Sequence, residues 1–164
     1  MVASVRSMET FDFRLAREND LDFISALSAR VFSKYGTYDE IVLGWLQEPA
    51  VMTVIIMAGA DPLGFAMVTL EREKWFEPRR AHLLAIGVFP KQQRKGIGTA
   101  LLKHMEEIAR QYGVKEILLW TAVDNQQALS FFQNAGFHIV GSEDCYYPRG
   151  QAALELSKRL GTKN

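Results

Sequence analysis

The chain has 164 residues, a length typical of one domain with a sizeable core, and 48% of them are hydrophobic, which excludes a largely disordered chain. Nineteen basic and nineteen acidic residues cancel, which argues against a nucleic-acid-binding domain, because such domains normally carry an excess of positive charge. The single cysteine, Cys145, excludes an internal disulfide and a zinc site built on cysteines.

Neither a signal peptide nor a membrane span is expected. The first ten residues lack an apolar core of signal-peptide length, and no run approaches the roughly 18 apolar residues of a membrane span. We therefore expect a soluble, cytoplasmic protein that does not insert into a membrane.

The first half of the chain predicts a strand, two helices and a pair of strands. Asp20 stands where it could cap the first helix. The inner face of that helix should carry Phe23, Ile24, Leu27 and Val31. Two β-branched or apolar runs around a turn then predict an antiparallel hairpin. The expected ranges are 11–16, 51–58 and 63–71 for the strands and 38–47 for the second helix.

The second half predicts a strand, a long helix, a strand, a short helix and two final strands. The apolar run 82–89 predicts a buried strand, which Pro90 would end. A helix beginning at about Thr99 has apolar residues at helical spacing. Asp124 or Asn125 should cap the short helix. The remaining strands are expected at 116–123, 137–141 and 152–160.

This order predicts an α/β fold in one domain, residues 11–160. The step from the strand at 82–89 through the long helix to the strand at 116–123 is a parallel βαβ crossover within an otherwise antiparallel sheet. We therefore expect a mixed, mostly antiparallel sheet with helices on both faces.

A short basic loop with two glycines joins the strand at 82–89 to the long helix. The first amides of a helix lack internal partners and carry partial positive charge, and glycine lets the backbone approach a phosphate closely. Arg94 and Lys95 add full charges. These features predict a diphosphate site, although an ordinary turn with solvated basic side chains would show the same pattern.

Two motifs resemble those of one enzyme superfamily. Val88-Phe-Pro followed by Gln93-Arg-Lys-Gly-Ile-Gly is similar to the acetyl-CoA motif of the GNAT acyltransferases, Q/R-x-x-G-x-G/A. The family's next motif, N-x-x-A-x-x-x-Y-x-x-x-G-F, is matched by Asn125, Ala128, Gly136 and Phe137. The expected element order also agrees with the GNAT fold.

The resemblance implies an N-acetyltransferase that moves an acetyl group from acetyl-CoA directly to a primary amine, without a covalent enzyme intermediate. The loop backbone would hold the CoA pyrophosphate, and the central strand would bond to the pantetheine arm where it splays from the next strand. A main-chain N–H near Ile86 would polarise the thioester carbonyl. The cofactor-binding residues implied are Ile86, Gly87, Val88, Gln93, Arg94, Lys95, Gly96, Ile97, Gly98, Thr99, Asn125 and Phe132.

Phe132 departs from the family motif. That position commonly holds a tyrosine whose hydroxyl is proposed to protonate the departing CoA thiolate. Either another group supplies the proton, or none is needed, because a thiol with a pKa of about 8.5 is a fairly good leaving group. The segment Cys145-Tyr146-Tyr147-Pro148 resembles the Tyr-Tyr segment of GNAT enzymes that acetylate protein N-termini, including ribosomal-protein alanine acetyltransferases. We hypothesise that Tyr146 or Tyr147 binds the acceptor or serves as the acid; an amphipathic hairpin edge is the alternative.

His82 is the candidate general base. The attacking amine must be neutral, and an unperturbed imidazole, with a pKa of about 6.5, suits base catalysis near neutrality. The position matches one where several GNAT protein acetyltransferases carry a catalytic Glu or Tyr; the alternative is a histidine satisfied at a strand end. Glu71 and Glu73 could guide a cationic acceptor or form a solvated strand end. Trp75 and Phe76 could wall the acceptor pocket or cover the sheet edge.

Two classes of function therefore remain open. The first is an acetyltransferase acting on a peptide N-terminus or a small amine, which His82 with Tyr146 or Tyr147 favours. The second is a non-catalytic acyl-CoA-binding module, a sensor or regulatory partner, which Phe132 favours. We expect Phe131 and Cys145 to be structural and find no set of metal ligands. The sequence leaves open whether the protein is a monomer or a homodimer.

Overall fold

The computed structural model describes residues 10–36, 38–71 and 79–161. Within these ranges, seven strands form one sheet in the order β1-β2-β3-β4-β5-β7-β6, and four α-helices accompany it. None of these helices is long and apolar enough to cross a membrane. The elements are β1 (Asp12–Leu15), α1 (Leu21–Phe32), α2 (Tyr38–Leu46), β2 (Val51–Ala58), β3 (Asp61–Glu71), β4 (Arg79–Val88), α3 (Ile97–Gln111), β5 (Val114–Ala122), α4 (Gln126–Asn134), β6 (His138–Glu143) and β7 (Ala153–Arg159), with short 3-10 turns η1 (Glu18–Asp20), η2 (Ser33–Tyr35) and η3 (Pro90–Gln92).

The element order and the mixed sheet confirm the sequence prediction. Each pair of neighbouring strands described is antiparallel except β4 with β5, which run parallel and are connected through α3. Some bounds differ. Strand β4 begins at Arg79, so His82 lies inside the strand and not at its start. Helix α3 begins at Ile97, ahead of the expected Thr99.

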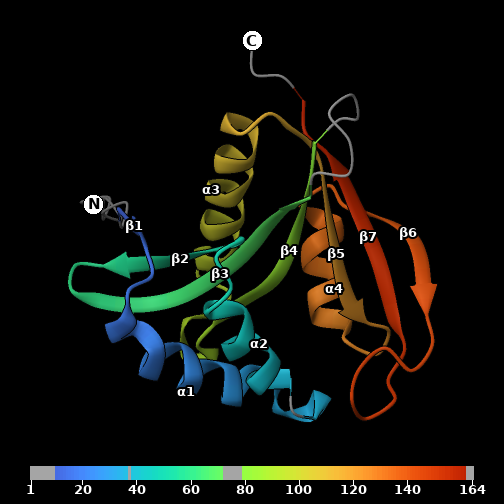
Figure 1. Cartoon of the computed structure of the whole chain (residues 1–164), viewed down its shortest axis with the longest axis horizontal. Coiled ribbons are helices and arrows are strands. Elements are labelled where there is room, and N and C mark those ends of the chain that lie inside the picture. Colours follow the sequence, from blue (N-terminus) through green and yellow to red (C-terminus); the bar gives the residue numbers. More distant parts are fainter. Residues whose placement is uncertain (1–9, 37, 72–78, 162–164) are drawn as a thin grey trace, which may run out of the picture.

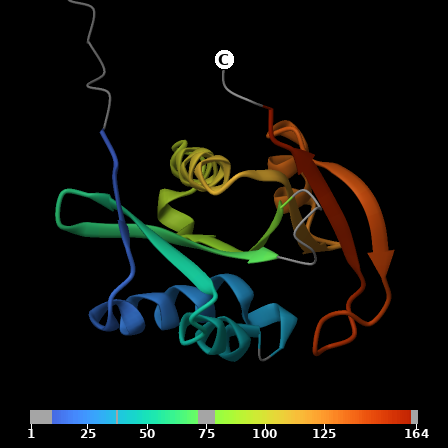
Figure 2. The ribbon, with the colours of Figure 1, turned by 45° about the horizontal axis from the view of Figure 1, so that its top comes forward.

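Helices cover both faces of the sheet, as predicted (Figures 1 and 2). Helices α1 and α2 lie on one face, where the core includes Ile24, Ile55 and Phe65. Helices α3 and α4 lie on the other face, where the core includes Leu101 and Ile117. The sheet is therefore buried on both sides, which explains the long apolar runs of its central strands.

A β-bulge at Leu84 changes the direction in which β4 presents its side chains. The register shifts between Met67 and Val68 of β3, which pair with Ala85 and Leu83, so Leu84 is an extra residue of β4 between two consecutive pairs. The β4 side chains in the α3-side core are consequently odd-numbered before the bulge (81 and 83) and even-numbered after it (86 and 88).

Strands β4 and β5 separate beyond this bulge. Their parallel pairing ends where Leu83 meets Leu119. Strand β5 goes on pairing with β7 as far as Ala122, and β4 goes on pairing with β3 as far as Val88. Residues 85–88 therefore have no partner among the described strands on the side of β4 that faces β5. The predicted separation of the two strands at their C-terminal ends is confirmed.

The predicted role of Asp20 as a helix cap is wrong. Its carboxylate makes no capping bond to α1. It accepts two hydrogen bonds from the Arg14 guanidinium, at 2.7 and 2.8 Å, and one from the Arg17 backbone N–H at 2.7 Å. The Arg14 hydrogen bonds lower the pKa of Asp20, and the pair fastens β1 to η1. The other predicted cap is confirmed, because Asn125 Oδ1 accepts from the Ala128 N–H at 3.1 Å.

Candidate functional site

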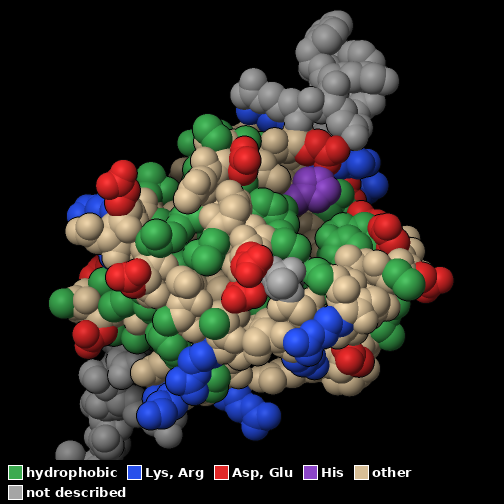
Figure 3. Space-filling view, turned by 60° about the horizontal axis from the view of Figure 1, so that its bottom comes forward, with side chains coloured by type: hydrophobic (Ala, Val, Ile, Leu, Met, Phe, Trp, Pro, Cys, Tyr) green, Lys and Arg blue, Asp and Glu red, His purple; other side chains and the backbone are tan. Residues whose placement is uncertain are grey.

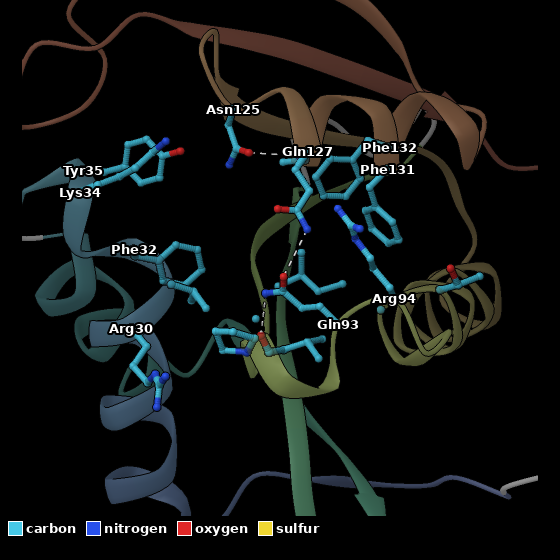
Figure 4. Close-up of a pocket in the computed structure, with 18 of the residues that line it drawn as sticks. Arg30, Phe32, Lys34, Tyr35, Gln93, Arg94, Asn125, Gln127, Phe131 and Phe132 are labelled. Carbon is cyan, nitrogen blue, oxygen red and sulfur yellow. Dashed lines mark hydrogen bonds between the residues drawn. The ribbon is translucent and has the colours of Figure 1, made fainter.

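A cavity of about 530 Å³ lies between the unpaired edge of β4, the end of α1 and helix α4 (Figure 4). Residues from three predicted parts of a cofactor site line it: the end of β4, the glycine loop and the start of α4. Ten of the twelve predicted cofactor-binding residues are in this lining: Ile86, Gly87, Val88, Gln93, Arg94, Gly96, Gly98, Thr99, Asn125 and Phe132. The fold thus brings segments about 40 residues apart to one hollow.

The other two predicted residues, Lys95 and Ile97, direct their side chains elsewhere. The Lys95 ammonium donates to Gln92 Oε1 at 3.5 Å and lines a separate hollow on the other side of the loop. Ile97 is 2% exposed and packs in the core. Only the backbone of these two residues belongs to the loop around the cavity.

The loop before α3 has the backbone conformation of an anion-binding turn. Arg94 and Gly96 both have positive φ, at 64° and 81°. No side chain caps α3, so its first amides are not engaged by a capping group. A Cβ at Gly96 would meet nothing within 4 Å, whereas one at Gly98 would contact the Phe131 ring at 3.5 Å. The helix N-terminus is therefore accessible from the cavity and carries partial positive charge.

Three cationic side chains surround the cavity. Arg94 comes from the loop, and Arg30 and Lys34 come from α1 and η2 on the opposite side (Figure 4). The lining contributed by the described residues holds no carboxylate. Elsewhere the charges are mixed: on the face that α1 and α2 cover, acidic side chains are scattered and several Lys and Arg side chains gather at the lower edge (Figure 3). The cavity therefore favours an anionic ligand although the whole chain is neutral.

Gln93 connects the glycine loop to two walls of the cavity, β4 and α4. Its amide nitrogen donates to the Val88 carbonyl at 3.1 Å, and its amide oxygen accepts from Gln127 Nε2 at 3.2 Å (Figure 4). The first bond holds the loop against the end of β4, and the second holds it against α4. The side chain thus fixes the walls, while the loop backbone remains directed at the cavity.

A smaller cavity of about 110 Å³ lies between β4 and β5. Both strands line it, together with η2, α4 and the segment before β7. Six residues line both cavities, so the two adjoin: Phe32, Tyr35, Ile86, Asn125, Ala128 and Phe132. A ligand can therefore extend from the basic loop, along the free edge of β4, into the interior of the sheet.

Of the two predicted tyrosines, Tyr147 lies on this path and Tyr146 lies beside it. Tyr147 is buried, lines the smaller cavity and packs 4.9 Å from the Tyr35 ring. Tyr146 is not in either lining; its ring stacks on Trp120 at 4.9 Å. Burial raises the pKa of Tyr146, and the Glu143 and Glu155 carboxylates raise it further. Tyr146 therefore stays protonated at neutral pH.

His82 is paired with Glu71, its neighbour across the β3–β4 ladder. Nε2 of the imidazole lies 2.5 Å from Glu71 Oε2, and both side chains are partly exposed. Because Ala81 and Leu83 belong to the α3-side core, His82 points to the α1–α2 side of the sheet. It lines neither cavity, but Leu84, two residues along β4, lines the smaller one.

Several lining residues were not predicted from the sequence. Arg30, Lys34 and Tyr35 come from the end of α1 and from η2, and Gln127 and Phe131 come from α4. Phe131, predicted to be a core residue, packs as a partly buried side chain against the α3-side core and also lines the larger cavity. The one available signal was the four-residue spacing of Arg30 and Lys34, which places cations on one side of a helix end.

Three of the minor predictions lie outside the described residues, namely those for Glu73, Trp75 and Phe76. Cys145 is exposed and lines neither cavity, so the structure gives it no place at the site.

Comparisons with known proteins agree with this geometry. The sequence model of the acetyltransferase (GNAT) family matches residues 15–137. The probable N-acetyltransferase san of Drosophila melanogaster is 25% identical over 136 residues, which are 82% of this chain and 62% of that protein. N-alpha-acetyltransferase 50 of Danio rerio is 32% identical over 76 residues, which are 46% of this chain and 45% of that protein. The matched segments thus span less than two thirds of the length of either relative.

Solved structures share the fold across nearly the whole chain. The ribosomal-protein-S18-alanine N-acetyltransferase of Escherichia coli superposes with a TM-score of 0.78 at 20% sequence identity. The superposition covers 94% of this chain and 97% of that one. The architecture of the sheet and its separated strands is therefore that of a known acetyltransferase fold.

Proposed function

Because the chain belongs to the acetyltransferase (GNAT) family, we propose that it is an enzyme that transfers an acetyl group from acetyl-CoA to a primary amine. One observation carries the proposal: a glycine loop, three cations and the unpaired edge of β4 line a single cavity. Acetyl-CoA needs each of these features. Its phosphates require cations and free amides, and the amide groups of its pantetheine arm suit a strand edge.

The residues that would hold the acyl donor follow from this arrangement. The backbone of loop 93–99 would bind the pyrophosphate, with Arg94 on one side and Arg30 and Lys34 on the other. Residues 86–88 would bond to the pantetheine arm along the free edge of β4, and a main-chain N–H near Ile86 would polarise the thioester carbonyl. Asn125 and Phe132 would border the arm.

His82 would act as general base, with Glu71 as its positioning residue. The imidazole would accept a proton from the attacking amine, and the Glu71 carboxylate, 2.5 Å from Nε2, would orient the ring. Direct attack by the amine is supported by the cavity linings, because among the described residues they contain no cysteine or serine that could carry the acyl group.

The acceptor would approach from the α1–α2 side, toward the aromatic residues at the inner end of the cavity. Tyr146 stacked on Trp120, with Tyr147 beside them, would form one wall of its groove. Relatives named as N-alpha-acetyltransferases favour a peptide N-terminus, whereas a relative named as an aminoglycoside acetyltransferase represents the small-amine alternative.

The test is release of CoA thiol from acetyl-CoA, followed with a colorimetric thiol reagent. The acceptor panel contains peptides with varied N-terminal residues, polyamines, aminoglycosides and free amino acids. Acceptor-dependent release establishes the transferase and separates peptides from small amines. Calorimetric binding of CoA without release for any acceptor contradicts the proposal.

That second outcome would support a non-catalytic acyl-CoA-binding module. One observation favours it: Phe132 lines both cavities at the position where the family motif has tyrosine, and it has no hydroxyl. A binding module needs the loop and the strand edge but no proton donor.

A further inference from the structure

The cavity contains a buried hydroxyl that the fold itself does not satisfy. Among the described residues, three buried side-chain polar atoms have no hydrogen-bond partner: Ser28 Oγ, Tyr35 Oη and Gln151 Oε1. Tyr35 is the one of these three residues that lines the cavities, and it lines both. Burying a hydroxyl without a partner destabilises a fold, so such a group calls for an explanation.

Tyr35 is a buried residue in the wall that the two cavities share. It belongs to η2, between α1 and α2, and is 4% exposed. Its ring packs against Tyr147 at 4.9 Å, and the Lys34 ammonium lies 5.0 Å from the ring centroid. In Figure 4 the Tyr35 oxygen points across the opening toward Asn125, with Phe132 on the far wall.

We propose that the Tyr35 hydroxyl donates the proton to the departing CoA thiolate, a role that rests on the proposed transferase function. Phe132, where the family motif places tyrosine, has no proton to give. Tyr35 lines the same two cavities as Phe132 and presents an O–H from the opposite wall. The proton donor would thus come from η2, between α1 and α2, and not from α4, where the family motif places it.

The step balances with groups already present. The amine nitrogen forms a bond to the thioester carbonyl carbon, and the C–S bond breaks with its electron pair on sulfur. The sulfur takes the Tyr35 proton and leaves as the thiol, while His82 takes the proton lost by the amine. The Tyr35 phenolate then regains a proton through water, and His82 releases one.

The other tyrosines near the site fit this role less well. Tyr146 lines neither cavity and stacks on Trp120. Tyr147 lines the smaller cavity but not the larger one, whereas Tyr35 and Phe132 line both. Both are better placed for the acceptor than for the leaving group.

The decisive variant is Tyr35→Phe, measured with two acyl donors and the best acceptor of the panel. With acetyl-CoA we expect kcat to fall about 10²-fold, the lower end for loss of a general acid, because a thiolate leaves fairly well unaided. With the selenoester analogue, whose selenolate is a weaker base and needs no proton, kcat should stay within about threefold of wild type. Tyr112→Phe, at an exposed tyrosine beyond α3, is the matched control and should change neither rate.

Two further measurements exclude a merely structural role. Removing an unpartnered buried hydroxyl should leave the Tm of Tyr35→Phe equal to or above that of wild type. Adding Phe132→Tyr to Tyr35→Phe restores a hydroxyl to the opposite wall and should recover at least tenfold in kcat with acetyl-CoA.

Three results would overturn the assignment: wild-type kcat for Tyr35→Phe with acetyl-CoA, an equal loss with both donors, or a lowered Tm. Absence of thiol release from the wild-type enzyme with every acceptor would refute the transferase itself, and the Tm measurement would still report on the buried hydroxyl.

Discussion

Replacing Gly64 by alanine should displace the part of β4 that lines the cavity. Gly64 lies on β3 directly opposite Val88 of β4. A Cβ at this position would lie 2.6 Å from the Gly87 carbonyl oxygen and 3.2 Å from Val88 Cγ2. The first contact is with backbone, which cannot rotate away as a flexible side chain can. Both Gly87 and Val88 line the larger cavity, so any relief of the clash moves the donor site.

The size of the effect follows from this geometry. A Cβ contact shorter than 3.0 Å is essentially never seen, so the strands must separate by at least 0.4 Å, the difference between 3.0 and 2.6 Å. Overpacking of this kind costs about 1–3 kcal/mol of unfolding free energy. A displacement of about 1 Å at a reacting group can cost about 10²-fold in rate, so roughly half that distance should lower kcat/KM for acetyl-CoA about tenfold.

The assay compares kcat/KM for acetyl-CoA and thermal unfolding in Gly64→Ala and Gly44→Ala. Gly44 lies in α2 with nothing within 4 Å of its Cβ position, so alanine there should stabilise the helix by about 1 kcal/mol and leave the kinetics unchanged. Wild-type kcat/KM and Tm for Gly64→Ala would refute the reasoning, because they would show that β4 need not lie this close to β3.

Three more predictions concern the loop, the base and acid stability. Gly96→Ala should raise KM for acetyl-CoA and cost about 1 kcal/mol, because φ is 81° there; an unchanged KM would contradict this. His82→Ala should lower kcat/KM about 10²-fold at neutral pH and less at alkaline pH, where the amine is already neutral, whereas the exposed His138→Ala should not; a loss independent of pH would exclude His82 as the base. Desolvation lowers the pKa of His104 in the folded protein. As the pH falls from 7 to 5, the imidazole is therefore protonated in the unfolded chain before it is protonated in the folded one, and the free energy of unfolding should decrease. His104→Phe keeps the stack on Phe13 and should show a smaller drop in Tm; a parallel drop would contradict the assignment.

The order of elements could be predicted because the ends of many helices and strands are marked by residues close to them in the sequence. Apolar runs, a helix-spaced face after Thr99 and an asparagine cap at Asn125 each depend on neighbours within a few residues. The cofactor loop was predictable for the same reason, since strand, glycines and helix N-terminus are contiguous in sequence. Ten of the twelve cofactor-binding residues that the two motifs predicted line one cavity.

The features that were predicted wrongly or missed depend on contacts between different elements of the fold. Asp20 has the sequence signature of a cap, but Arg14 on the neighbouring strand offers two charged hydrogen bonds and takes its carboxylate. The bulge at Leu84 has no local signal, because it is defined by the register against β3. Tyr35 was not singled out in the sequence, because only the fold places it in the same cavity linings as α4 residues.

One geometric cause connects these site features. Because the bulge at Leu84 lies next to the last parallel pair at Leu83, β4 leaves β5 and the edge of residues 85–87 has no partner strand there. Backbone N–H and C=O groups require partners, so an edge inside the protein is costly unless a ligand bonds to it. The acyl donor would complete the sheet there as an added strand, and in doing so it would bring its thioester between the Tyr35 and Phe132 walls. Binding and catalysis would then depend on the same interruption of the sheet, which explains why the residues of both functions lie around the gap between β4 and β5.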